Sequence, residues 1–481
     1  MNPAAATRDE TPLSWAMLLG ACAGGLGWGI RGQYGHETGA MIAGLLVSLV
    51  VALLFGGSLD SRQLIRAVAW GTIAMGFGGS MTYAQTIGLT QNAPVIGNVA
   101  ALRWGMIGLA LKGGIWIAFG ALFLGMGLSG VRYRTREMLV LMLTLVGLYF
   151  VGCATINAPF DPANKILPRV YFSASWEWEP GASLKPRPEC WGGLLLSLVA
   201  VFAFTFAWKR DAFAWRLGLF GLLGGAMGFP LGQSLQSFHA WNPQLFSQGA
   251  IHALDAHINW WNMMETTFGA VMGAAIVFGV WKHRVLIGGG GTSATGSEPS
   301  PCWFEGLLLA AHTALLIESE FGSVRWIHAT YDIGLVLGLL PMVASASGRW
   351  WPWFLALPVT LLPIAVKTVN QLAREERAVE PELGWVVYCA LPMAFAVALA
   401  IRLARSAMRS GDGNHAGLRW PAYALLASTW IYFGLNFAFF RYPWPWSPWT
   451  YRTPNGIIYA ACATLLTIAC VKRLRAARGE P

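Results

Sequence analysis

Long apolar stretches and short polar connections alternate from one end of the chain to the other. An apolar stretch of about 20 residues is long enough to cross the hydrocarbon core of a membrane as a helix. The pattern predicts fourteen such helices, at 13–30, 38–57, 64–86, 104–128, 138–157, 191–208, 212–233, 262–281, 302–319, 327–347, 350–368, 384–404, 420–440 and 455–472. Apolar and polar residues alternate only weakly within these stretches, which argues against a membrane β-barrel.

The composition supports the same fold class. Hydrophobic residues make up 55% of the chain and charged residues only 12%, which is far from the balance of a soluble domain. In lipid every backbone polar group must be bonded within the protein, so the apolar stretches should be helices. The 57 glycines fit this interpretation, because glycine allows membrane helices to approach each other closely. The predicted fold is therefore an all-α polytopic membrane protein.

The net charge of +10 is distributed unevenly over the connections. If the N-terminus is cytoplasmic, the even-numbered connections and both termini face the cytoplasm and hold most of the 33 Lys and Arg. This is the bias expected of cytoplasmic loops. We therefore expect a protein of the inner (cell) membrane with both termini in the cytoplasm. Its basic surface would meet anionic lipid headgroups, and nucleic acid is not needed as a partner.

Two segments of the chain match each other at an offset of 200 residues without a gap. The matched positions are Trp15 and Trp215, Leu19 and Leu219, Gly24-Gly25 and Gly224-Gly225, and Gly32-Gln33 and Gly232-Gln233. The segments belong to the first and the seventh predicted helix, so the repeating unit would hold six helices. An even number gives both units the same orientation, which is a parallel internal repeat.

This repeat divides the chain into three predicted parts. Residues 1–210 form the first six-helix unit and include a long outer loop at 158–190. Residues 211–410 form the second unit and include a flexible, glycine-rich inner linker at 288–301. Residues 411–481 add a terminal helix pair whose connection, 441–452, is rich in Trp and Pro.

Polar and charged side chains gather in the outer halves of the predicted helices. Charges inside a membrane are costly and often mark a functional site, although those at headgroup level simply pair or meet water. The sequence predicts a substrate-binding site formed by Arg31, Gln33, His36, Glu37, Lys112, Gln233, Glu265, Asp332 and Asn436.

Lys112 is the deepest of the predicted charges. It lies between Leu111 and Gly113 in an apolar helix, too far inside for its ammonium group to reach the surface easily. We expect a salt bridge to Glu37, Glu265 or Asp332, or an opening to a water-filled outer cavity. A structural ion pair and the binding of an anionic ligand are equal alternatives at this point.

Two further groups are weaker candidates. His252, Asp255 and His257 carry metal-binding side chains, but their spacing matches no strong motif, so a polar interfacial segment is favoured and no metal is assigned. The seven cysteines show neither a disulfide framework nor a zinc spacing, and no cofactor is predicted. The tryptophans of 441–452 would stack on sugar rings or form part of an interfacial aromatic belt.

No catalytic or nucleotide-binding motif is visible: the chain lacks a phosphate loop, a GxSxG elbow, a dinucleotide fingerprint and an HExxH pair. The favoured function is a secondary transporter of a small polar solute, sugar-like or anionic. Arg31 and Lys112 would meet the anionic group, and Glu37, Glu265 or Asp332 would carry a coupling proton.

The alternative is a membrane-embedded glycosyl or acyl transferase at the outer face, which would act on a lipid-linked or glycan substrate. His36 or Glu37 would then be the general base. The inner halves of the predicted helices hold few polar groups, which favours the enzyme because alternating access needs an inner exit. The duplication favours the transporter.

Overall fold

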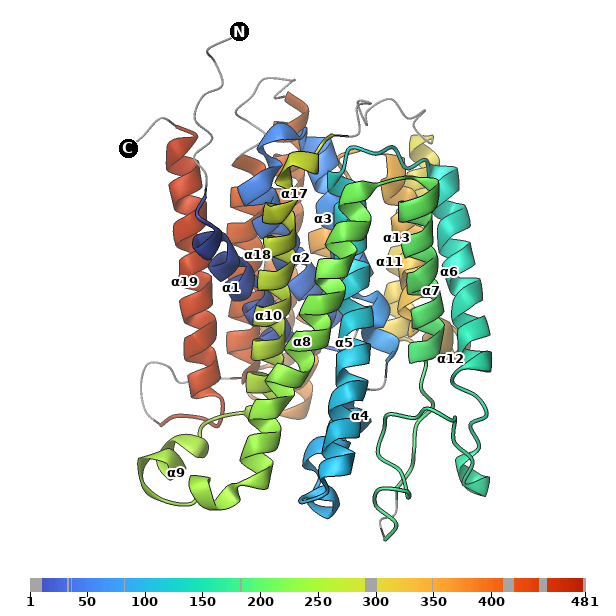
Figure 1. Cartoon of the computed structure of the whole chain (residues 1–481). Helices are drawn as coiled ribbons and strands as arrows, with labels where there is room; N and C mark the ends of the chain where they lie inside the picture. The colour runs from blue at the N-terminus through green and yellow to red at the C-terminus, as the bar shows by residue number, and fades with distance from the viewer. Residues whose placement is uncertain are drawn as a thin grey trace.

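The protein is a bundle of helices whose axes run roughly side by side (Figure 1). The computed structural model describes residues 11–32, 34–35, 37–81, 83–181, 184–289, 301–347, 349–409, 419–440 and 448–478. Within these ranges the only β pairing is an isolated bridge between Asp161 and Ile166. The all-helical fold class predicted from the sequence is therefore confirmed for the described residues.

The helices follow the predicted apolar stretches closely. The first part of the chain forms α1 (Leu13–Arg31), α2 (Glu37–Phe55), α3 (Ser61–Met75), α4 (Ala84–Gln91), α5 (Val99–Leu128), α6 (Thr135–Thr155) and α7 (Trp191–Ala203, continued to Trp208). The middle part forms α8 (Ala212–Trp241), α9 (Gly249–Asp255), α10 (Trp260–Lys282), α11 (Cys302–Phe321), α12 (Arg325–Tyr331) and α13 (Gly334–Ala344). The last part forms α14 (Pro352–Phe354), α15 (Thr360–Val369), α16 (Pro381–Gly384), α17 (Leu391–Arg409), α18 (Arg419–Phe440) and α19 (Thr453–Ala476).

Among the described residues, ten helices are long and apolar enough to cross a membrane, or eleven if α11 and α12 form one bent span. The chain is thus a multi-pass membrane protein. Three predicted spans fall outside even the set of eleven. α3 has only 15 residues, α13 belongs to a short apolar helix, and α18 does not meet the criteria for a span. The count of fourteen spans stays a prediction.

Two predicted spans are interrupted. The stretch 64–86 is not one helix, because α3 ends at Met75 and a 3₁₀ turn, Phe77–Ser80, separates it from α4. Glycines at 76, 78 and 79 surround this break and weaken a continuous helix. The stretch 327–347 is divided between α12 and α13, and α12 is bent by 108° relative to α11.

The bundle has two distinct faces, which we name by what they carry. α1 begins and α19 ends at one face, the terminal face (Figure 1). The connection between α6 and α7 and the short helix α9 lie at the opposite face, the loop face (Figure 1).

An apolar stripe on α8 marks the level of the membrane. The exposed residues of this stripe are Leu219, Leu223, Met227, Leu231, Leu235 and Phe238. Spacings of three and four place them on one side of the helix. From first to last they cover about 28 Å at the rise of an α-helix, close to the thickness of the hydrocarbon core. Met227 and Gly228 therefore lie near the middle of the membrane.

Glycines bring the central helices into backbone contact. A Cβ atom built on Gly24 of α1 would lie 2.0 Å from the carbonyl oxygen of Gly269 in α10. A Cβ atom on Gly225 of α8 would lie 2.0 Å from the carbonyl oxygen of Gly113 in α5. No side chain fits at these crossings, so α1, α10, α8 and α5 pack as a tight central unit.

Gly269→Ala should therefore destabilise the protein by about 1–3 kcal/mol or more, as overpacking does, because its Cβ meets the backbone of Gly24. The thermal midpoint of the purified protein in detergent measures this effect. Gly147→Ala in α6 is the matched control, since a Cβ there meets nothing within 4 Å. Equal midpoints for the two variants would contradict the packing described for α1 and α10.

The two segments that match at an offset of 200 run in the same direction and pack on the same helix. α1 and α8 both run from the terminal face toward the loop face (Figure 1). A Cβ on Gly32 would lie 2.4 Å from Oε2 of Glu265, and a Cβ on Gly232 would lie 2.3 Å from the carbonyl oxygen of Met264. The matched glycines thus meet consecutive residues of α10. The larger repeat of two six-helix units stays a prediction.

Candidate functional site

A buried ion pair lies where α1 ends. The Nη2 atom of Arg31, the last residue of α1, lies 3.1 Å from Oε1 of Glu265 on α10. The two side chains are 1% and 0% exposed. Arg31 also donates to the hydroxyl of Tyr83, and the indole nitrogen of Trp261 donates to Oε1 of Glu265 at 3.1 Å. The charges are therefore paired and hydrogen-bonded, as burial of an ion pair requires.

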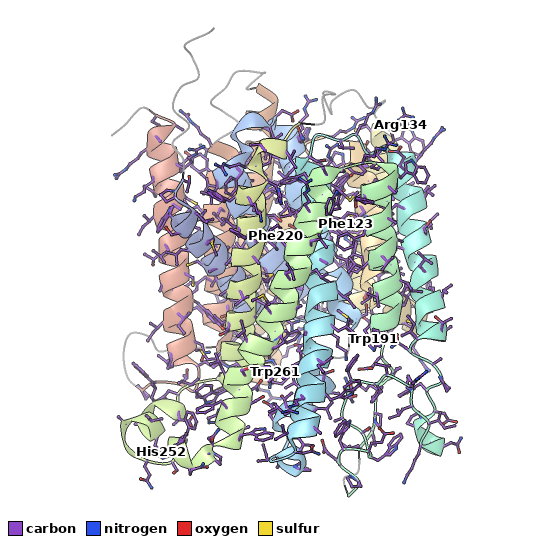
Figure 2. All side chains as sticks on the ribbon, in the orientation of Figure 1. Phe123, Arg134, Trp191, Phe220, His252 and Trp261 are labelled. Atoms are coloured by element: carbon purple, nitrogen blue, oxygen red, sulfur yellow. The ribbon has the colours of Figure 1, made fainter. Side chains whose placement is uncertain are left out.

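Aromatic rings surround the guanidinium of Arg31. Its Cζ atom lies 5.1 Å from the ring centroids of Trp28 and Tyr83 and 5.4 Å from that of Trp116. Cation–π attraction is strongest for such desolvated cations. The ring of Tyr83 lies 5.4 Å from that of Phe229, which follows Gly228 in the middle of the α8 stripe. The aromatic cage of Arg31 therefore lies deep in the membrane. Trp261 lies closer to the loop face (Figure 2).

The connection between α1 and α2 is partly buried against the bundle. Tyr34, in the connection, is fully buried. Its hydroxyl faces Thr368 of α15 and Asn436 of α18. Gly35 has a φ of +91°, which favours glycine, and allows the chain to reverse before α2. The stretch 64–86, which is broken between α3 and α4 just before Tyr83, is a discontinuous helix of the kind that often lines solute sites in membrane proteins.

Lys112 forms a second buried ion pair, but with a partner that the sequence analysis did not name. Its Nζ atom lies 2.6 Å from Oε1 of Glu189 and donates to Thr86 at 2.7 Å. Both charged side chains are almost completely buried. The expectation of Glu37, Glu265 or Asp332 as partner is wrong, because the end of the loop before α7 enters the bundle and brings Glu189 to Lys112.

Glu189 is held by several donors besides Lys112. The hydroxyl of Ser173 donates to its Oε1 at 2.8 Å. The backbone nitrogen of Phe172 and the indole nitrogen of Trp191 donate to its Oε2 at 3.1 and 3.2 Å. Such a saturated carboxylate is typical of a structural ion pair rather than of a ligand site, since few acceptor positions remain for exchange.

Lys112 also lies deep. Its neighbour Gly113 touches Gly225, three residues from the middle of the α8 stripe. The two ion pairs are connected through one short segment, because Tyr83 contacts Arg31 and Thr86 contacts Lys112.

A third polar cluster lies beside the connection between α1 and α2. The Nζ atom of Lys367 lies 2.6 Å from Oε2 of Glu320 and donates to the carbonyl oxygen of Tyr34 at 3.1 Å. Thr38 donates to Oε1 of Glu320 at 3.1 Å. Glu37 and Asp332 are electrostatic neighbours of the same pair. Three carboxylates thus share one lysine here, and this pair is partly exposed, unlike the two deep pairs.

The predicted site residues therefore separate into groups. Arg31 and Glu265 form the central pair, and Lys112 belongs to a separate pair. The residues near the connection between α1 and α2 are Glu37, Asp332 and Asn436. Gln233 is buried against α4, where it donates to Thr90 at 2.8 Å. Gln33 and His36 lie outside the described residues.

Sequence reasoning missed Glu189, Lys367 and the rings around Arg31. Lys367 lies in the apolar stretch 350–368, where a lone lysine is as unusual as Lys112. The same argument from desolvation would have found it. Glu189 carries no such signal, since it precedes the predicted helix 191–208.

The halves of the helices nearer the terminal face also hold buried polar groups. Arg66 of α3 is buried and its Cζ atom lies 5.2 Å from the ring of Trp70. The indole nitrogen of Trp70 donates to Ser345 at 2.9 Å. Thr72 and Ser48 are buried nearby, and the hydroxyl of Ser48 lies close to Gly71 of the next helix.

The side chains of the weak metal candidates form hydrogen bonds or a salt bridge with other residues. His252 and His257 contact the carbonyl oxygens of Phe246 and Thr450 through Nδ1, at 3.1 and 3.2 Å. Asp255 pairs with His239, whose Nε2 lies 3.0 Å from its Oδ1. Over the described ranges, no group of three or more His, Cys, Asp or Glu is arranged to hold a metal ion.

Comparison of the chain with protein-family models, with curated proteins and with solved structures finds no match. The functional argument therefore depends on the geometry of the site alone.

Proposed function

We propose that the protein is a secondary transporter of a small anionic solute, and that Arg31 is the group that binds the anion. The observation that supports this most is the Arg31–Glu265 pair, which is buried deep in the membrane and contacts Tyr83 after the break between α3 and α4. A buried charge in a membrane bundle favours a function in solute or proton movement. The aromatic cage of Trp28, Tyr83 and Trp116 would also suit the apolar face of a sugar-like solute.

The proposed cycle is a competition for Arg31. The carboxylate or phosphate group of the solute displaces Glu265 from the guanidinium. An unpaired carboxylate in an apolar interior takes up a proton rather than remain charged. Solute binding and protonation of Glu265 would therefore occur together, and release of the solute would return the proton when the pair re-forms.

The cluster at Lys367 would supply the proton. It is partly exposed, it contains Glu320, and its electrostatic neighbours Glu37 and Asp332 lie at the start of α2 and after α12. The connection between α1 and α2 links it to Arg31 over a few residues. Carboxylates that share a site hold protons more readily than isolated ones, because like charges repel.

Uptake into liposomes tests the proposal. Purified protein would be reconstituted, an inward proton gradient imposed, and accumulation of labelled D-glucuronate, L-lactate or inorganic phosphate measured. We expect at least one of these anions to accumulate above protein-free liposomes, and neutral D-glucose to stay at the background. Failure of all three anions would contradict an anion transporter of this kind.

The proposed orientation places the terminal face in the cytoplasm and the loop face outside, in an inner (cell) membrane. In a background with Cys302 replaced by Ser, Lys165→Cys should react with an impermeant maleimide in intact cells, because the loop that carries it would lie outside. Arg134→Cys, between α5 and α6, should react only after the membrane is opened. The reverse order of labelling would invert the topology and contradict the charge argument.

A transferase at the outer face is a second candidate, and one pair favours it. His239 is stacked on Trp260 with ring centroids 4.6 Å apart and paired with Asp255, 29% and 22% exposed. A histidine held by a carboxylate is a typical general base. Release of a sugar or an acyl group from a lipid-linked donor that His239→Ala abolishes would favour the enzyme over the transporter.

A further inference from the structure

A pocket at the loop face has a volume of about 550 Å³, and its lining includes none of the residues of the buried ion pairs. Its walls come from the start of α5 and from the connection between α6 and α7. The residues that matter for its chemistry are Trp104, Lys165, Arg169, Tyr171, Glu177 and Trp178. We call it the loop pocket. A volume of this size accommodates a small ligand such as a mono- or disaccharide.

The loop that forms the pocket is fixed to the bundle. The backbone nitrogen of Ala174 donates to the carbonyl oxygen of Gln85 at 3.0 Å, and the side chain of Gln85 accepts from the backbone of Arg187 at 3.1 Å. The hydroxyl of Tyr171 donates to the carbonyl oxygen of Arg187 at 2.9 Å. The pocket is therefore preformed, which reduces the entropy cost of binding.

The turn at one edge of the pocket is also held in place. The amide side chain of Asn164 donates to Asp161 at 2.6 Å, and this hydrogen bond holds the pKa of Asp161 below its usual value. The next residue, Lys165, has a φ of +56°, a conformation that L residues rarely adopt outside fixed turns. The turn therefore fixes the backbone of Lys165 at the edge of the pocket.

Trp104 gives the pocket a fixed aromatic wall. Its indole nitrogen donates to the carbonyl oxygen of Tyr171 at 2.8 Å. The ring of Phe172 packs against it at 4.8 Å between centroids. Because these contacts fix the ring on one side, the other side is available to the pocket, which Trp178 lines as well. Tryptophan faces stack on the apolar face of a sugar ring.

The charges of the pocket favour an anion. Lys165 and Arg169 are exposed, and neither forms a salt bridge within the described part of the chain. Glu177 is the only acid among the lining residues, so the cations exceed the acids by one. A guanidinium and an ammonium group bind a carboxylate through charge-assisted hydrogen bonds. The carboxylate of Glu177 would accept hydrogen bonds from hydroxyl groups.

From these walls and charges we infer that the loop pocket binds an acidic sugar, with the ring on Trp104 and Trp178 and the carboxylate on Lys165 and Arg169. The inference goes beyond the proposed transport, because a transferase would use the same pocket. The acidic sugar has two possible sources, a free sugar or the headgroup of a glycolipid.

Binding of D-glucuronate to the full-length protein in nanodiscs tests the inference by calorimetry. We expect saturable binding, weaker binding of neutral D-glucose, and loss of about tenfold in affinity or more in the Lys165→Gln/Arg169→Gln variant. Arg187→Gln is the matched control, because it lies on the same loop and is exposed but does not line the pocket. All of these titrations use the Arg31→Met/Glu265→Gln background, which removes the proposed central anion site without leaving Glu265 unpaired, so the binding that is measured belongs to the loop pocket.

A second arm distinguishes the sources of the sugar. Nanodiscs that contain a glucuronosyl glycolipid should compete with free D-glucuronate if the headgroup is the ligand, and should not compete if the free sugar is. Either result supports an acidic-sugar pocket. Absence of binding to both forms overturns the inference, as does binding that is unchanged in Lys165→Gln/Arg169→Gln. Failure of uptake with intact binding would overturn the proposed transport alone.

Discussion

Replacing Arg31 with methionine is expected to abolish uptake of the solute, by at least about 100-fold, which corresponds to a loss of roughly 3 kcal/mol of binding. Methionine keeps an apolar stem of similar length and removes the only positive charge of the central pair. The solute would then have no counter-charge inside the aromatic cage of Trp28, Tyr83 and Trp116. Initial rates of uptake into liposomes measure the effect.

The single variant also leaves Glu265 buried without its partner, so a control must separate binding from folding. Arg31→Met/Glu265→Gln removes both charges and keeps the shape of the glutamate side chain. We expect this double variant to regain the thermal stability of the wild type and still to fail in uptake. Normal uptake by the stable double variant would remove Arg31 from the binding site and with it the proposed competition.

Lys112→Met should reduce the stability of the protein by about 3–5 kcal/mol, because Glu189 would stay buried with no opposite charge. The double variant Lys112→Met/Glu189→Gln should recover most of the loss, because it removes the unpaired charge and keeps an acceptor oxygen for the donors that surround Glu189. Thermal unfolding of the purified protein measures both. Uptake should be close to normal in the double variant, because Glu189 is saturated by other donors and the pair is structural.

Lys209→Met provides a matched comparison. Lys209 pairs with Glu137 at 3.0 Å, but both side chains are partly exposed, at 14% and 27%. Water therefore replaces the lost partner, and the expected loss is below about 1 kcal/mol. If Lys112→Met/Glu189→Gln were stable but inactive, Lys112 would be a ligand-binding residue and the structural assignment would be wrong.

The sequence was sufficient to predict the helical bundle because hydrophobic length alone determines where a membrane helix can form. It was not sufficient to predict the breaks. The stretch 64–86 is apolar throughout its middle, yet α3 stops at Met75. Glycines at 76, 78 and 79 permit the break, but the close packing of Trp116 against Gly78 and of Glu37 against Gly79 sets its place. Such contacts depend on helices far apart in the sequence.

The sequence indicates which polar residues could lie inside the bundle more readily than it indicates which of them form pairs. Arg31 and Glu265 are in the predicted set because charges at the outer ends of apolar stretches are costly to bury and often mark a functional site. The sequence cannot say which acid meets which base, since that depends on how α1 crosses α10. Glu189 shows the limit most clearly: it precedes a predicted helix, and only the path of the loop through the bundle brings it to Lys112.

The glycines that match at an offset of 200 illustrate which structural features a sequence match predicts and which it does not. The match at an offset of 200 predicts two segments of equal orientation, and α1 and α8 do run in parallel against α10. The residues that precede the two matched glycines differ. Arg31 precedes Gly32 and is paired, whereas Phe229 and Leu231 occupy the corresponding turn of α8. The matched glycines therefore both take part in packing on α10, whereas the buried charge occurs in one segment only.

The most direct test of the proposed competition is the response of uptake to a proton gradient in the wild type and in Glu265→Gln. The solute would be the anion that accumulates in the uptake experiment. Glutamine preserves the shape of the side chain but cannot exchange a proton. The account predicts that an inward proton gradient accelerates uptake by the wild type, while Glu265→Gln exchanges the solute at a rate that does not depend on the gradient. Uptake by Glu265→Gln that still follows the gradient would contradict Glu265 as the proton carrier.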